Sequence, residues 1–172
     1  MIRRIVIVGK GGSGKDHLRK ELEKHGLKYC VSHTTRPPRH GEEDGIDYHF
    51  IGQREANMMK NRDEFYESVV FNEWIYGTSI REFYASNLFI MTPSGLSKMK
   101  KEDRERSFVV YLDIEEDVRK ERLLKRNDAD NVERRLNADH ADFLDFTDYD
   151  YSITNPFFQN CEDIIEISKI NF

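Results

Sequence analysis

The stretch of sequence that decides the fold is IRRIVIVGKGGSGK, residues 2–15. Its first half is rich in β-branched apolar side chains, as is typical of a strand covered on both faces. Its second half, GKGGSGK, has the spacing G-x-x-x-x-G-K. Leu18 and Leu22 then repeat at helical spacing until Gly26, which predicts a helix directly after the glycines. A strand, a glycine-rich turn and a helix in this order predict a loop that binds phosphate groups.

The chemistry of this loop follows from its residue types. Glycines let consecutive backbone N–H groups turn inward around a phosphate, and the helix N-terminus adds a favourable dipole. Lys15 can reach the β- and γ-oxygens of a nucleoside triphosphate. We therefore expect Lys15 to be catalytic, and we expect ATP to be bound by Gly9, Gly11, Gly12, Ser13, Gly14, Lys15 and Asp16.

Asp16 departs from the usual pattern, which places Ser or Thr after the lysine so that a hydroxyl can bind Mg²⁺. The helix dipole favours an acidic residue in a first turn, so Asp16 can be an ordinary helix-start residue. It can equally be a metal ligand. Both interpretations stay open, and Mg²⁺ is the expected cofactor.

The rest of the chain alternates short apolar runs with amphipathic segments such as residues 115–125. This alternation predicts an α/β fold with a parallel central sheet flanked by helices. The expected strands are residues 2–8, 28–31, 88–91, 108–112 and 151–153.

Two stretches interrupt the alternation. Residues 32–79 are rich in Pro, Gly and aromatic residues, which indicates loops and short strands in a small antiparallel insert. Residues 125–131 are a polar loop between two helical segments. We expect one domain over residues 1–172. Its core would comprise residues 1–31 and 86–172, with an insert over about 32–85 and a short helical lid over about 125–135.

The bulk composition narrows the class of protein. The 172 residues suffice for one domain, and the net charge of −5 disfavours nucleic acid as a partner. Apolar runs are too short to cross a bilayer, and the first residues lack the apolar region of a signal peptide, so we expect a cytoplasmic protein. Cys30 and Cys161 lack disulfide or metal-site spacing, and we expect both to be small buried apolar residues.

The most specific pattern is SHTTRPPRHGEEDGIDYHF, residues 32–50. It resembles the nucleoside-monophosphate-binding region of guanylate kinases, whose run is S-x-T-T-R-x-x-R-x-G-E-x-x-G-x-D-Y-x-F. The resemblance spans most of the chain, from about residue 5 to 155. It implies the fold of the P-loop nucleoside monophosphate kinases, with an NMP-binding insert and a lid, and transfer of the γ-phosphoryl group of ATP to GMP or dGMP. The expected partners are ATP and GMP or dGMP, bound by a monomer or homodimer, with neither nucleic acid nor a membrane.

The residues of the insert support this chemistry directly. Arg36 and Arg39 lie three apart in a stiff proline-containing loop, where two guanidinium groups can clamp a phosphate dianion. By the resemblance, Tyr48 adds a hydroxyl to the same phosphate and Glu67 accepts from guanine N1–H and the 2-amino group, a donor pair that adenine lacks. The resemblance implies a GMP site made of Ser32, Arg36, Arg39, Glu42, Tyr48, Glu67, Tyr76, Thr78 and Thr92.

Arginines near the lid match those that guanylate kinases use for catalysis. Because phosphoryl transfer depends on positioning and on positive charge, Arg122, Arg126 and Arg135 are the expected catalytic arginines. Arg134 cannot share the helix face of Arg135, so we expect it to be exposed to solvent. Asn155 matches a position that lines the pocket for the adenine of ATP.

One departure from the family pattern lies at the end of the strand 88–91. Guanylate kinases usually carry two aspartates there, one that reads guanine and one that supports the hydrated metal, and this chain has Ile90 and Thr92. Selectivity for guanine is therefore less firmly predicted than kinase activity. Two alternatives stay open: a ribose 1,5-bisphosphate phosphokinase, whose phosphate loop can also read GKD, and a catalytically silent guanylate-kinase-like module that binds proteins.

Overall fold

The computed structural model describes residues 1–71, 73–125, 131–158 and 162–170. In chain order the elements are β1 (Arg4–Gly9), α1 (Lys15–Lys24), β2 (His33–Thr34), β3 (His49–Phe50), α2 (Gln53–Asn61), β4 (Phe65–Phe71), β5 (Trp74–Ser79), α3 (Ile80–Ala85), β6 (Leu88–Met91), α4 (Pro93–Leu96), α5 (Lys101–Arg104), β7 (Ser107–Leu112), α6 (Glu116–Lys125), α7 (Val132–Asp142), β8 (Tyr151–Ile153) and α8 (Glu162–Ser168).

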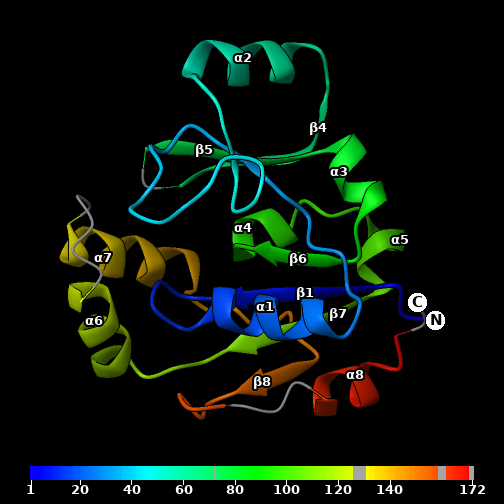
Figure 1. The fold of residues 1–172 in the computed structure, drawn as a ribbon, viewed down its shortest axis with the longest axis vertical. Helices are drawn as coiled ribbons and strands as arrows, with labels where there is room; N and C mark the ends of the chain where they lie inside the picture. Colours follow the sequence, from blue (N-terminus) through cyan, green and yellow to red (C-terminus); the bar gives the residue numbers. More distant parts are fainter. Residues whose placement is uncertain (72, 126–130, 159–161, 171–172) are drawn as a thin grey trace.

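The central sheet has the strand order β6-β1-β7-β8, and each neighbouring pair is parallel (Figure 1). β1 lies between β6 and β7, so that Ile5 pairs with Leu88 on one side and with Phe108 on the other. The apolar run of β1 is buried from Ile5 to Val8, as the sequence predicts for a strand with two covered faces. The carboxyl end of β1 therefore delivers the glycine-rich loop to one edge of a rigid sheet.

Alternate residues of β1 pack on opposite faces of this sheet. Ile5 and Ile7 pack with the helix α1 leucines and with α8, while Val6 and Val8 belong to a second cluster that contains side chains of α3 and α4 and Phe143, which follows α7. Helices thus cover both faces, which confirms the predicted α/β class. Figure 1 shows α6 and α7 at the end of the sheet where the glycine-rich loop emerges.

A second sheet, of order β3-β2-β5-β4, lies above the first in Figure 1, with α2 on its far side. β5 pairs antiparallel with both β4 and β2, as expected for the insert, whereas β2 and β3 pair in parallel. The insert places the β4 and β5 side chains opposite the glycine-rich loop. The two sheets form the walls of the site described below.

Some local predictions need correction. Residues 28–31 do not form a strand, because Tyr29 makes one isolated bridge to Leu88 before the chain turns away into the insert. β1 begins at Arg4, not at residue 2. Cys30 is buried as predicted, and Cys161 lies outside the described residues. In the described part of the chain, none of the helices has the length and apolar character needed to span a membrane.

Candidate functional site

The glycine-rich loop, which we call the phosphate loop (residues 9–15), is built mainly from backbone. Gly12 and Gly14 have φ angles of 78° and 102°, a conformation that glycine adopts without strain. A side chain at Gly12 would also meet the carbonyl oxygen of Arg119 at 2.7 Å. Helix α1 begins at Lys15, whose Nζ donates to Gly9 O at 2.6 Å and to Lys10 O at 3.1 Å. The ammonium group is therefore held across the mouth of the loop.

Arg122 of α6 braces the back of this loop. Its Nη1 donates to Gly12 O at 3.1 Å and to Ser13 O at 3.3 Å, and its Nη2 donates to Pro156 O at 2.6 Å. The Ser13 hydroxyl is buried and has no partner in the described structure. The sequence suggests that Arg122 contacts the transferred group, but the structure engages its guanidinium with loop carbonyls outside the main pocket.

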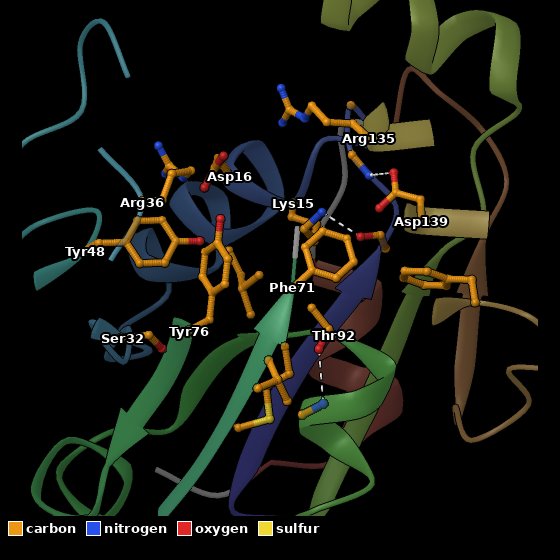
Figure 2. A pocket seen from close by; sticks show the side chains of 18 of the residues that line it. Lys15, Asp16, Ser32, Arg36, Tyr48, Phe71, Tyr76, Thr92, Arg135 and Asp139 are labelled. Atoms are coloured by element: carbon orange, nitrogen blue, oxygen red, sulfur yellow. Dashed lines mark hydrogen bonds between the residues drawn. The ribbon is translucent and has the colours of Figure 1, made fainter. Parts of the chain in front are cut away.

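One pocket lies between the phosphate loop and the insert (Figure 2). It brings together most of the predicted residues: Gly9, Gly11, Gly12, Gly14, Lys15, Asp16, Ser32, Arg36, Arg39, Tyr48, Glu67, Tyr76, Thr92 and Arg135. Ile90, which stands at a family aspartate position, also lines the pocket. The sequence did not predict the residues that complete the lining: Val69, Phe71, Gly77, Met91, Gly95, Asp139 and Phe143. Apolar side chains carry no motif, so no local signal marks Val69, Phe71 or Phe143 before the fold is known.

Arg36 and Arg39 stand at the insert side of the pocket. Arg36 is 3% exposed, and its guanidinium lies 5.5 Å from the centre of the Tyr48 ring. Its Nε is buried without a partner in the described structure, as expected for a donor that an anion can satisfy. Burial, and then the charges of Arg135 and Arg36, lower the pKa of Arg39. The guanidinium groups of Arg36, Arg39 and Arg135 all line this pocket, where their charges would stabilise a phosphate group.

Glu42 holds the two insert arginines in place. Its Oε1 accepts from Arg36 Nη2 at 2.9 Å and lies 3.7 Å from Arg39 Nη1, while Oε2 accepts from the Arg39 backbone N–H at 2.7 Å. Burial alone would raise the pKa of Glu42, but the hydrogen bonds from Arg36 and Arg39 outweigh burial and lower it. Glu42 is absent from the lining of the main pocket, so the structure places it behind the clamp and not against a base.

The other end of the pocket is arranged around Glu67 of β4. Its Oε1 accepts from the Thr78 backbone N–H at 3.1 Å, and Thr78 Oγ1 lies 3.3 Å from Ser32 Oγ in a hydrogen bond. Glu67 is 8% exposed, and burial raises its pKa above the ordinary value of a glutamate. Thr78 supports Glu67 and Ser32 from behind, since it does not itself line the pocket.

Thr92 and Ile90 stand where the family pattern has aspartates. Thr92 Oγ1 accepts from Gly95 N at 3.1 Å and so caps the N-terminus of α4. A side chain at Gly95 would approach Glu67 Oε2 to 3.4 Å. The threonine thus orders the turn beside Glu67, and the apolar Ile90 lines the pocket without offering a carboxylate.

Helix α7 supplies Arg135 and Asp139 to the same pocket (Figure 2). Asp139 Oδ2 accepts from the Gly11 backbone N–H at 2.7 Å and lies 3.7 Å from Arg119 Nη1. Burial raises the pKa of Asp139, and the Lys15 charge and the Gly11 hydrogen bond oppose this effect. The spacing of four between Arg135 and Asp139 is the one sequence signal that both share a helix face.

Three predictions concern residues outside this pocket. Arg134 is not simply solvated: its side chain is 40% exposed, pairs with Glu73 at 2.6 Å and lies 5.4 Å from the Trp74 ring centre. Asn155 accepts from Phe157 N at 2.9 Å and lines a separate groove beside β8. Arg126 lies outside the described residues. The roles of Asn155 and Arg126 therefore stay predictions.

Comparisons with known proteins agree on one family. The guanylate kinase family model matches residues 1–168. A guanylate kinase of Campylobacter jejuni strain RM1221 is 32% identical over 164 residues, which cover 88% of this chain and 80% of the relative. A guanylate kinase of Schizosaccharomyces pombe is 48% identical over 82 residues, a match that covers 46% of this chain and 41% of the relative.

A solved structure shares the fold. The guanylate kinase of Anaplasma phagocytophilum superposes with a TM-score of 0.68 at 23% identity, covering 98% of this chain and 81% of that chain. At this identity the likeness supports the fold alone, while the family model and the Campylobacter relative support membership. The phosphate loop and the arginine clamp face one pocket, in agreement with these matches. The chain belongs to the guanylate kinase family, whose members phosphorylate GMP with ATP.

Proposed function

We propose that this chain transfers the γ-phosphoryl group of ATP to GMP or dGMP, giving ADP and GDP or dGDP. The observation that carries the proposal is the placement of two anion sites on one pocket: the phosphate loop on one wall and the Arg36–Arg39 clamp on the other. A donor and an acceptor phosphate bound at these sites would face each other. Such positioning is a large part of catalysis of phosphoryl transfer.

At the donor side, the amides of the phosphate loop and Lys15 would hold the β- and γ-phosphates of ATP. Arg135 would stabilise the charge that develops on the equatorial oxygens during transfer. Arg122 would act through the loop that it braces, since its guanidinium donates to loop carbonyls. Asn155, beside the Pro156 carbonyl that Arg122 also contacts, would line the adenine site.

At the acceptor side, Arg36, Arg39 and Tyr48 would bind the phosphate of the monophosphate. Glu67, supported by Thr78, would accept from guanine N1–H and the 2-amino group. Ser32, hydrogen-bonded to the same threonine, would complete the base contacts. Tyr76, whose ring centre lies 6.0 Å from that of Tyr48, would complete the wall between phosphate and base. Thr92 would act indirectly by ordering the turn next to Glu67.

The pocket residues also fit Mg²⁺ as the cofactor. In the described part of the chain, no cluster of three or more His, Cys, Asp or Glu side chains could hold a metal ion by itself. Mg²⁺ commonly binds through one or two carboxylates together with substrate phosphates, and the exposed Asp16 lines the pocket next to Lys15. Asp16 would thus help to hold the ion, which neutralises phosphate charge when bound.

The two alternative functions make different demands on these residues. A ribose bisphosphate substrate has no base, so it would offer no N–H donor pair to the buried carboxylate of Glu67. A silent binding module would not need Lys15 fixed across the loop mouth by two hydrogen bonds. Both arrangements support the nucleotide kinase, for which we propose a cytoplasmic location.

A coupled assay of ADP formation tests the function directly. Purified enzyme with ATP and Mg²⁺ is offered GMP, dGMP, AMP, dTMP and ribose 1,5-bisphosphate in parallel. We expect turnover with GMP or dGMP at least about 100-fold above that with AMP, because a site built for a donor pair rejects bases that lack it. Turnover with the ribose bisphosphate alone, or with none of the acceptors, would contradict the proposal.

A further inference from the structure

Helix α7 and its C-cap residue direct three buried side chains to the pocket. Arg135 and Asp139 are four residues apart on one face of the helix, and Phe143 follows directly after its last residue, at the C-cap. Arg135 has a role in the reaction proposed above, and Asp139 has none. Figure 2 shows the Asp139 carboxylate beside the phosphate loop, with its hydrogen bond drawn as a dashed line.

The contact of Asp139 with the loop is at Gly11. The carboxylate accepts from the Gly11 N–H at 2.7 Å, and Arg119 Nη1 donates to the Gly11 carbonyl at 3.4 Å. The same Arg119 nitrogen lies 3.7 Å from Asp139 Oδ2. Both backbone polar groups of Gly11 are therefore held, one by a side chain of α7 and one by a side chain of α6.

Glycine at position 11 makes room for this carboxylate. Gly12 and Gly14 need glycine because of their positive φ angles, but the φ angle of Gly11 lies outside that range. A β-carbon at Gly11 would lie 3.1 Å from Asp139 Oδ2, closer than nine in ten such contacts, so the carboxylate would have to shift. The third position of the loop is thus fitted to the side chain that approaches it from α7.

The carboxylate is 5% exposed, and a buried charge is costly unless it is paired and hydrogen-bonded. Asp139 meets both conditions through Arg119 and Gly11. Its position is therefore fixed by protein contacts and not by solvent. Because Asp139 is part of α7, these contacts also fix the helix against the loop.

We propose that Asp139 is a positioning residue, whose hydrogen bond to Gly11 fixes α7 against the phosphate loop and so places Arg135 for phosphoryl transfer. The inference rests on the proposed function, which gives Arg135 its role. One helical turn of about 5.4 Å separates the two side chains along the helix. A misplacement of about 1 Å can cost about 100-fold in rate, so a fixed distance matters.

Two substitutions separate the hydrogen bond from the charge. Asp139→Asn and Asp139→Ala remove the same negative charge, but asparagine keeps an oxygen that can accept from Gly11 N–H. We expect Asp139→Ala to lower kcat by about tenfold or more, and Asp139→Asn to stay within about threefold of wild type. KM for GMP should change by less than about threefold in both, because the insert is untouched. Glu133→Gln removes one charge from the exposed face of α7 and serves as the matched control.

A double-mutant cycle tests whether Asp139 acts through Arg135. If it does, Asp139→Ala should lower kcat by less than about threefold in an Arg135→Ala background, compared with about tenfold in the wild type. A purely structural role would instead give the same loss in both backgrounds. Equal kcat values for the Asn and Ala variants would likewise overturn the proposal, since the hydrogen bond would then carry no effect.

Amide hydrogen exchange at Gly11 gives a readout that does not depend on turnover. We expect protection in the wild type and in Asp139→Asn, and faster exchange in a folded Asp139→Ala protein. Unchanged exchange in the Ala variant would show that the hydrogen bond does not hold the loop. If wild-type enzyme transfers no phosphoryl group to GMP or dGMP, the proposed function fails. In that case the double-mutant cycle of Asp139→Ala and Arg135→Ala is measured with ADP dissociation constants instead of kcat. Additive losses of ADP affinity in this cycle would overturn the positioning role, whatever the acceptor substrate is.

Discussion

The phosphate loop and the arginine clamp both create positive potential, but they do so by different means. The loop presents backbone amides, a helix N-terminus and Lys15, with its carbonyls held from behind by Arg122. The clamp consists of side chains, and the arginines are held by the carboxylate of Glu42. One site is rigid because of its backbone and the other because of an ion-pair network on an insert.

This difference teaches where each site is sensitive. A backbone site tolerates few changes in shape, so its catalytic contribution should concentrate in Lys15, the single charged side chain held across its mouth. In a side-chain site several charged groups share the binding of the phosphate, so the loss of one arginine should weaken the binding of GMP without abolishing it. Substitutions at the two sites should therefore separate kcat from KM.

The largest expected effect is at the loop. Lys15→Ala should lower kcat by at least about 100-fold, because it removes a contact to the transferred phosphoryl group. Lys24→Ala, at the exposed end of the same helix, is the control and should leave kcat unchanged. Steady-state ADP formation measures both, and near wild-type turnover in Lys15→Ala would remove the loop from the mechanism.

The clamp should give the next largest effect. Arg39→Ala should raise KM for GMP by roughly 10- to 100-fold, since a hydrogen bond to a charged group contributes about 1.5–3 kcal/mol. KM for ATP should change far less. Arg54→Ala, on the exposed face of α2 in the same insert, controls for loss of positive charge. Equal shifts in both KM values would mean that Arg39 does not belong to the acceptor site alone.

The comparison also explains how much could be predicted from the sequence. The phosphate loop is contiguous, and the strand and helix signals lie directly before and after its seven residues. The clamp is nearly contiguous, and its role followed from Arg36, Arg39 and Tyr48. Glu42 was assigned to the GMP site, but its two oxygens face the arginines, a detail that depends on how the loop folds back.

Contacts between distant segments could not be predicted. Asp139 meets Gly11 across 128 positions, and neither residue looks unusual in a helix or in a glycine-rich loop. Phe71 and Phe143 line the pocket because two sheets and a helix converge there. The run 28–31 resembles a strand in composition, yet the chain leaves the sheet after one bridge because it must enter the insert. Such outcomes depend on tertiary packing, which overrides local propensity.

Acidification should affect the two ends of the acceptor site differently. Burial raises the pKa of Glu67, so it takes up a proton at a higher pH than the value of about 4.3 for an exposed glutamate. If GMP needs the ionised carboxylate, KM for GMP should rise by up to about tenfold per pH unit below that raised pKa.

Glu67→Gln supplies the control for this pH dependence. Glutamine does not ionise, so any remaining change in KM between pH 7 and about pH 5 reports the GMP phosphate, whose second pKa is about 6. We expect the wild-type KM to rise more steeply than that of the variant. Parallel profiles would show that Glu67 ionisation does not govern GMP binding.

The smallest expected effect is at Asp16. Asp16→Asn keeps the shape and removes a charge near the bound phosphates, so Mg²⁺ should matter less for nucleotide binding. The ratio of the ADP dissociation constants without and with Mg²⁺ should fall by about fivefold, because the substitution removes a Coulomb interaction of about 1 kcal/mol between the carboxylate and the ion. Isothermal titration calorimetry measures both constants. An unchanged ratio, with a loss of a few tenths of a kcal/mol in stability, would make Asp16 a helix-start residue.

The central claim is that the two walls of one pocket bind different phosphates. Equilibrium titration of ADP and of GMP, each alone, into wild type, Lys15→Ala and Arg39→Ala tests it most directly. We predict that Lys15→Ala weakens ADP binding by at least about tenfold and GMP binding by less than about threefold, and that Arg39→Ala gives the reverse. Equal weakening of both ligands by either substitution would contradict the account.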